Sequence, residues 1–220
     1  MANVKIADLK NEDATINLKG LIGSALTMDW KQIAMYEGRI FTTTIGTLST
    51  GIVGGGAVTI PDIDLPEFLI DIPEGYVVVP ISMSIQGNCS DAVADHDVLE
   101  AFICKCTDVR WDGTGTCTSE TPICMKTVGG RTSVCRVRSA FNTVDITTAP
   151  VHAIDLAREE VKFEKPAAGE TPVILRLDYA PKVPPFIVGP TMITGYWGGT
   201  SAVTGYAQLY WAEYETSELF

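Results

Sequence analysis

The chain has 220 residues, a mass of 23.7 kDa, a net charge of −11 and a pI near 4.6. Because 46% of its residues are apolar and only 20% are charged, its composition excludes a disordered chain. The acidic charge argues against tight binding of a nucleic-acid backbone by the whole surface. No apolar run reaches the length of a transmembrane helix, and the electrically neutral N-terminus lacks the pattern of a signal peptide, so we expect a protein made in the cytoplasm.

The composition favours an all-β fold. Valine, isoleucine and threonine together make 63 residues, and 20 glycines and 12 prolines lie among them. β-Branched side chains suit a pleated sheet, and glycine and proline favour turns. We therefore expect a β-sandwich or barrel with about eight strands and less than about 15% helix.

Residues 1–24 have no clear period and are interpreted as an N-terminal arm, with a single domain from 25 to 220. A turn is expected at Pro73–Gly75, between two β-rich runs. Period-two alternation or β-rich composition predicts strands within 25–50, 66–72, 77–85, 98–110, 133–141, 172–179, 191–197 and 205–215.

One segment resembles a helix. Thr147–Pro150 has the composition of a helix N-terminus, and the apolar residues Val151, Ile154 and Val161 that follow can form one stripe. The sequence therefore predicts a short helix at 151–161.

Six cysteines are the sharpest local feature, and all lie between residues 89 and 135. They are Cys89, Cys104, Cys106, Cys117, Cys124 and Cys135. Up to three disulfides, buried thiols and a metal site are the three interpretations, and the absence of a Cys-x-x-Cys pair disfavours zinc. No cofactor or metal is expected.

Cys104 and Cys106 lie two residues apart on a predicted strand, so their side chains leave the same face. Such a spacing does not favour a bond between them. We expect at least one disulfide from this strand to the 117–135 region, which would stabilise the chain by roughly 3 kcal/mol in the chain-entropy model.

The same part of the chain is basic. Residues 104–138 contain six basic and three acidic residues, whereas the rest of the chain is strongly acidic. Arg136 and Arg138 are expected on one side of a strand, where they could contact phosphate groups or an acidic neighbouring subunit. A solvated strand face is the alternative.

Catalytic residues are sparse. His96 lies in an acidic segment in which Asp91, Asp95 and Asp97 could bind a cation, although a solvated turn is the simpler interpretation. A hydrolase that uses an acid pair such as Asp62 and Asp64 is a further hypothesis, and ordinary surface charge is by a wide margin the better explanation of that pair. We expect no enzyme.

The C-terminal run GYWGGTSAVTGYAQLYWAEYE resembles the closing strands of single jelly-roll capsid proteins of icosahedral viruses and bacteriophages. The run PEFLIDIPEGYVVVPISMSI is similar to the early strands of such domains. The resemblance implies an eight-stranded jelly-roll β-sandwich with an extended N-terminal arm. It also implies no catalytic residues and self-assembly into a virus shell.

The implied partners are copies of the same chain and other capsid proteins, and the implied location is the virion. Many capsid proteins that touch the genome have a basic N-terminal arm, whereas this arm is neutral, so limited or indirect nucleic-acid contact is expected. At a net charge of −11, repulsion between acidic subunits would make assembly stronger as salt is added.

The alternative is a soluble β-sandwich module that binds a ligand or glycan without catalysis. Its stacking residues would be Trp111, Tyr196, Trp197 and Trp211, although aromatic residues in strands more often belong to a core.

Overall fold

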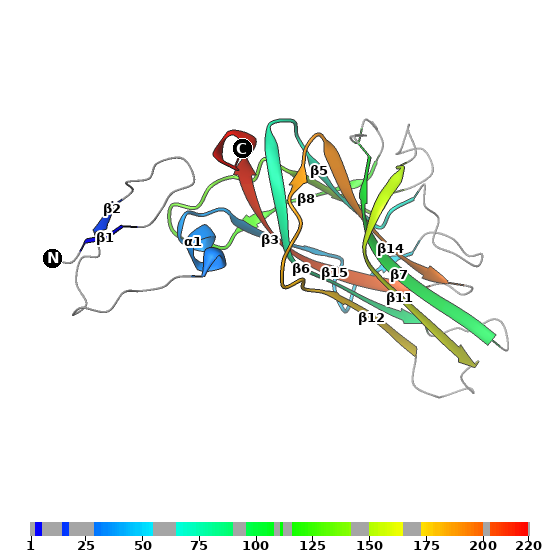
Figure 1. The fold of residues 1–220 in the computed structure, drawn as a ribbon. Coiled ribbons are helices and arrows are strands. Elements are labelled where there is room, and N and C mark those ends of the chain that lie inside the picture. The colour runs from blue at the N-terminus through cyan, green and yellow to red at the C-terminus, as the bar shows by residue number, and fades with distance from the viewer. Residues whose placement is uncertain are drawn as a thin grey trace. The chain divides into compact units, whose positions relative to one another are not determined.

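A computed structural model gives the fold of the chain (Figure 1). It describes residues 3–5, 15–17, 29–54, 65–89, 96–107, 111, 116–141, 150–164, 173–199 and 203–219. The chain divides into two compact units, residues 1–33 and 34–220. The first unit contains the antiparallel pair of β1 (Asn3–Lys5) and β2 (Thr15–Asn17). The arm boundary predicted after residue 24 lies outside the described residues.

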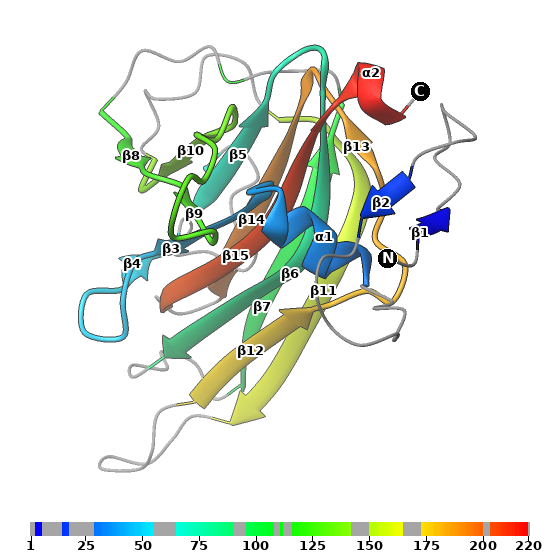
Figure 2. The same cartoon turned by 90° about the vertical axis from the view of Figure 1, so that its left-hand side faces the viewer.

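The second unit is all-β, as expected, and forms two antiparallel sheets (Figures 1 and 2). The order of the six-stranded sheet is β11-β7-β14-β5-β10-β8. Its strands are β5 (Phe68–Ile72), β7 (His96–Cys106), β8 (Thr118–Glu120), β10 (Arg136–Ser139), β11 (His152–Glu164) and β14 (Thr191–Gly199).

The seven-stranded sheet has the order β12-β6-β15-β3-β9, with β13 also paired to β6 and β4 to β15. Its strands are β3 (Ile40–Ile45), β4 (Ile52–Val53), β6 (Tyr76–Cys89), β9 (Ile123–Cys124), β12 (Val173–Tyr179), β13 (Ile187–Val188) and β15 (Thr204–Glu215). The described residues form two short helices, α1 (Trp30–Tyr36) and α2 (Thr216–Leu219).

Among the described residues, eight strands have five or more residues, and they pair as the two halves of one long hairpin would. The first pairs with the last, β3 with β15, and the second with the seventh, β5 with β14. The third strand, β6, pairs with the sixth, β12, and the fourth strand, β7, pairs with the fifth, β11. The pairings β6–β15 and β7–β14 then join these hairpin segments into two sheets.

The structure confirms the burial pattern expected for β3 and the turn expected at Gly75. In β3, Phe41, Thr43 and Ile45 are buried while Thr44 is exposed, which is the period-two pattern of a half-buried strand. Gly75 has a φ of 82°, a conformation that favours glycine, and it lies in the turn between β5 and β6.

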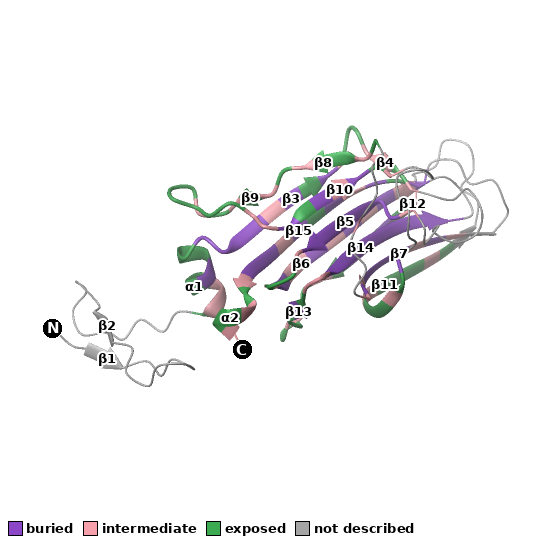
Figure 3. Ribbon diagram, turned by 90° about the horizontal axis from the view of Figure 1, so that it is seen from above, coloured by how far each residue is buried: buried purple, intermediate pink, exposed green. Residues whose placement is uncertain are grey.

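The main core lies between the two sheets, and its strands are largely buried in Figure 3. Trp197 and Trp211 are fully buried there, one from each sheet. A second apolar cluster lies on the other side of the six-stranded sheet, here called the outer face. It consists of Leu69, Phe102, Cys104, Cys106, Met192 and Tyr196, with Trp111 and Phe141 packed against it.

The segment between β7 and β11 is a long insertion that adds strands to both sheets. Its β8 and β10 extend the six-stranded sheet beyond β5, and β9 extends the other sheet beyond β3. The insertion therefore occupies one edge of the two-sheet structure, whereas β11 and β12 form the opposite edge (Figure 2).

The helix predicted at 151–161 is wrong, because this segment is strand β11. It pairs with β7 from His152 to Glu164, and two register irregularities, at 152–154 and 155–157, shift its alternation. Val151 and Ile154 are more than half exposed, so the apolar spacing that resembles a helix stripe does not mark a buried face. Pairing along β7 overrides the local helix signal.

Gly195 provides a test of the packing between β14 and β5. A Cβ at Gly195 would lie 2.0 Å from Cε1 of Phe68, which is fully buried. We expect Gly195→Ala to lower the free energy of unfolding by about 1–3 kcal/mol, because the methyl group forces the ring out of place. Urea unfolding measures this loss. The double variant Gly195→Ala, Phe68→Leu should lose less free energy of unfolding than the two single variants lose together, because the smaller side chain makes room for the methyl group. Strictly additive losses would contradict the contact between Gly195 and Phe68.

Among the described residues, no helix has the length and apolar character needed to cross a membrane.

Candidate functional site

Cys104 and Cys106 project together from the outer face of β7, as their spacing predicts. Their Sγ atoms lie 3.1 and 3.4 Å from the Oγ1 of Thr194 on the neighbouring strand β14, and both cysteines are fully buried. The hydrogen bond with Cys106, followed by burial, raises the pKa of the Cys104 thiol. A Cys104 thiol that resists ionisation is a poor nucleophile and metal ligand. Both side chains are buried in the apolar cluster of the outer face, so the pair packs as small core residues.

The other cysteines lie elsewhere in the fold, and all six are thiols in the structure. Cys89 and Cys135 belong to the core between the sheets, on the opposite face from Cys104. Cys124 donates a hydrogen bond to the carbonyl oxygen of Gly38 at the edge of the other sheet.

Cys117 precedes β8, which is four strand positions from β7, a separation of roughly 19 Å at the usual strand spacing. A disulfide needs Cα atoms less than about 7 Å apart. This fold therefore does not favour the disulfide predicted from the 104/106 strand to the 117–135 region. Intact mass before and after alkylation, with and without reductant, tests that prediction.

Arg136 and Arg138 share the outer face of β10, but each already has a partner. Nε of Arg136 lies 3.9 Å from a carboxylate oxygen of Asp71, whose side chain is buried. The guanidinium of Arg138 lies 4.7 Å from the ring centroid of Trp111. Arg136 therefore compensates a buried carboxylate and Arg138 stacks on an indole, which reduces what this pair can offer to phosphate.

Most of the acidic residues predicted for a cation site or an acid pair lie in segments that the structure does not describe. Asp62, Asp64, Asp91 and Asp95 lie outside the described residues, as do the side chains of His96 and Asp97. Within the part of the chain that is described, no three His, Cys, Asp or Glu side chains gather as metal ligands would.

The aromatic residues proposed as a sugar platform are largely inaccessible. Tyr196, Trp197 and Trp211 are fully buried, and the half-buried Trp111 lies beneath Arg138. Tyr196 stacks on Phe102 and its hydroxyl lies 3.1 Å from Nε2 of His152, whose pKa is lowered mainly by burial. These rings stabilise the two clusters and present no stacking face to a sugar.

The sequence interpretation missed the role of Glu213, a buried carboxylate on β15. Its oxygens accept hydrogen bonds from the Ser133 hydroxyl at 2.5 Å, the backbone N–H of Val134 at 2.9 Å and the Trp211 indole at 2.8 Å. Glu213 thereby attaches the insertion to the last strand. Its position in the aromatic-acidic run 210–215 is the only signal in the sequence, and it indicates no partner.

A pocket of about 100 Å³ opens beside this contact. Arg39, Arg131, Glu213 and Tyr214 contribute to its lining. Arg39 is already engaged: its guanidinium makes a two-point contact with Glu218 of α2 at 2.5 and 2.8 Å and lies over the Tyr214 ring. The contact fixes the C-terminal helix at the start of β3 and leaves Arg39 little capacity for a ligand.

This ion pair predicts a dependence of stability on pH. Hydrogen bonds from Arg39 hold the pKa of Glu218 below its ordinary value of 4.5. The ion pair therefore contributes to the free energy of unfolding above pH 4.5, and this contribution is lost as the pH falls toward the lower pKa of Glu218 in the folded protein. We expect Glu218→Gln to lower the free energy of unfolding by about 1 kcal/mol at pH 7 and by much less at pH 3. Urea unfolding at both pH values measures this, and an equal loss at both would contradict the assignment.

The two edges of the two-sheet structure differ in charge and carry exposed apolar side chains. The part of the insertion at residues 116–141, the insertion edge, has four basic residues and one acidic residue. Strand β11, the β11 edge, has four acidic and two basic residues. The insertion edge carries the exposed apolar side chains Ile123, Met125 and Val128. At the β11 edge, Ile154 of the strand and Val151 just before it are exposed.

Comparison of the chain with known protein families, with curated proteins and with solved structures finds no match.

Proposed function

We propose that this protein is a capsid subunit that adopts a jelly-roll β-sandwich and assembles with copies of itself into an icosahedral virus shell. Its location is then the virion, and other capsid proteins are further partners. It acts as a structural protein without catalysis, and its contact with the genome is limited.

The order of the eight long strands is the observation that carries the proposal. Numbered one to eight along the chain, they stand in the orders 1-8-3-6 and 2-7-4-5 in the two sheets. A long antiparallel hairpin rolled over on itself produces these two orders, and the resulting double Greek key is the jelly roll. Viral capsid proteins are a principal class that uses this architecture.

The surface supplies the second argument, because the fold alone does not determine function. The aromatic residues that a glycan-binding module would need are largely buried, whereas exposed apolar side chains lie at both edges of the two-sheet structure. Apolar groups that remain exposed in one copy are covered when copies associate.

The charges support limited contact with nucleic acid. The net charge is −11, and both arginines of β10 are engaged within the chain, Arg136 with Asp71 and Arg138 with Trp111. Binding of a phosphate backbone requires a basic surface that can release counterions. The inner surface of the proposed shell therefore contacts the genome at few points or through another protein.

Assembly of the purified chain tests the proposal. Light scattering combined with negative-stain microscopy should show uniform closed particles above a critical protein concentration. Glycan-induced thermal stabilisation of a persistent monomer would instead identify a binding module, and that result would contradict the shell.

A further inference from the structure

We propose that copies of this chain associate head to tail, with the β11 edge of one copy docked against the insertion edge of the next. This inference rests on the proposed function and specifies its subunit contact. The occupant of each edge is a second copy of the same chain.

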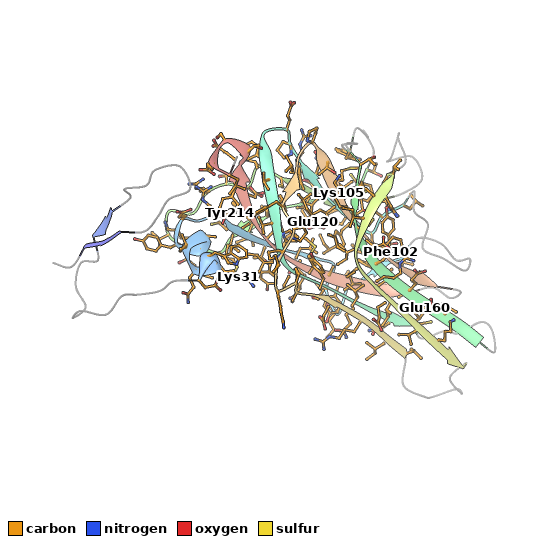
Figure 4. All side chains as sticks on the ribbon, in the orientation of Figure 1. Lys31, Phe102, Lys105, Glu120, Glu160 and Tyr214 are labelled. Atoms are coloured by element: carbon orange, nitrogen blue, oxygen red, sulfur yellow. The ribbon has the colours of Figure 1, made fainter. Side chains whose placement is uncertain are left out.

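The two edges lie at opposite ends of the two-sheet structure, and β11 and β8 are the end strands of its six-stranded sheet. Glu160 on β11 and Glu120 on β8 mark them in Figure 4. Five strand spacings separate β11 from β8, which is roughly 24 Å. A single copy therefore cannot bring its own two edges together. Contact between unlike edges requires a second copy and generates a ring where the rotation between copies closes.

Charge complementarity selects the partner surface. Arg131 is exposed on the insertion edge, where Arg136 is already engaged by Asp71, and Asp155, Glu159 and Glu160 are exposed on the β11 edge. Arg158 and Lys162 already pair within the β11 edge, with Asp155 and Glu160 respectively, so its net negative charge remains for a neighbour. Opposite potentials on two surfaces steer docking and fix its orientation.

Exposed apolar side chains accompany the charges on each edge. Ile123 is 64% exposed and Val128 80% exposed on the insertion edge, while Val151 and Ile154 are 54% and 59% exposed at the β11 edge. A contact with apolar groups and surrounding charges has the composition of a subunit interface. Each edge thus offers both components that its counterpart needs.

Symmetric pairing of two β11 strands is disfavoured. An antiparallel pair centred on residue 158, 159 or 160 would place Arg158, Glu159 or Glu160 opposite its own copy, and like charges directly opposite are destabilising. The two register irregularities near the start of β11 also interrupt a regular ladder there. These features favour docking through side chains over continuation of the sheet.

Charge reversal tests the contact in the full chain. The variants are Glu159→Lys on the β11 edge, Arg131→Glu on the insertion edge, and the double variant. Each single change should raise the critical concentration for assembly about tenfold, because it places like charges across the contact, and the double variant should return to within about threefold of the unmodified chain. Far-UV circular dichroism and thermal melts establish that each variant is folded.

Glu74→Lys and Lys182→Glu are matched controls, because both residues are exposed and lie outside the two edges. They change the net charge by the same amounts as Glu159→Lys and Arg131→Glu do, and they should leave the critical concentration for assembly unchanged. Salt gives an independent measurement. Attraction between opposite edges predicts weaker assembly at high salt, which is the reverse of the dependence expected from repulsion at a net charge of −11.

The outcomes separate this contact from the proposed function. Particles that form from the unmodified chain and respond to the edge variants no more than to the controls would overturn the contact and leave the shell intact. A double variant that assembles less well than both single variants would overturn head-to-tail docking. An unmodified chain that stays monomeric at every salt concentration would overturn the shell, and with it a second copy as the occupant.

Discussion

Replacement of Trp197 by alanine is expected to lower the free energy of unfolding by about 3–5 kcal/mol. The side chain is fully buried between the sheets, and its Nε1 donates a hydrogen bond to the carbonyl oxygen of Ile52 at 3.1 Å. Gly205 packs directly on the indole, since a Cβ there would lie 2.8 Å from Nε1. Truncation thus leaves a large cavity and removes a donor at once.

Urea unfolding of Trp197→Ala, Trp197→Phe and Val183→Ala measures these contributions. Trp197→Phe retains much of the apolar volume but loses the hydrogen bond, so its free energy of unfolding should lie between those of the unmodified chain and the alanine variant. Val183 is 86% exposed, and Val183→Ala should change stability by less than about 0.5 kcal/mol. A loss below about 1 kcal/mol for Trp197→Ala would show that the two sheets do not enclose this side chain.

Replacement of Glu213 by alanine is expected to destabilise the protein by about 3 kcal/mol and to release the insertion from β15. The change removes the acceptor of the Ser133 hydroxyl, the Val134 N–H and the Trp211 indole together. Each buried hydrogen-bond donor that is left without an acceptor lowers the free energy of unfolding by about 1–3 kcal/mol.

Glu215→Ala is the matched control, because Glu215 lies two residues further along the same strand and is exposed. Urea unfolding gives the global loss, and limited proteolysis should cut Glu213→Ala faster within residues 123–134. Equal proteolysis of the two variants would contradict the role of Glu213 as the attachment point. If docking uses the insertion edge, Glu213→Ala should also impair assembly, since that edge loses its support.

Much of the fold could be predicted from the sequence where burial follows a simple period. The alternation of β3, the turn at Gly75 and the shared face of Cys104 and Cys106 all follow from local pattern. Strand β11 could not be predicted, because it lies at a sheet edge and its register irregularities break the period of two. An edge strand is specified by pairing with β7, which no local pattern records.

The surfaces were harder to predict than the strands. The shared face of Arg136 and Arg138 follows from their spacing, but their partners Asp71 and Trp111 come from segments distant in sequence. The three hydrogen bonds to Glu213 likewise depend on where the insertion folds. The opposite charges of the two edges are visible in the amino-acid composition, but only the strand order shows that these segments lie at opposite ends of the two-sheet structure.

A three-dimensional density map of the assembled protein by electron cryomicroscopy tests the shell most directly. We expect a closed icosahedral particle in which each subunit density accommodates the two-sheet unit of residues 34–220, with β11 of one copy facing the insertion edge of its neighbour. Open or irregular aggregates, or a preparation that contains only the 23.7 kDa monomer at every concentration, would contradict the proposal that this chain builds a shell.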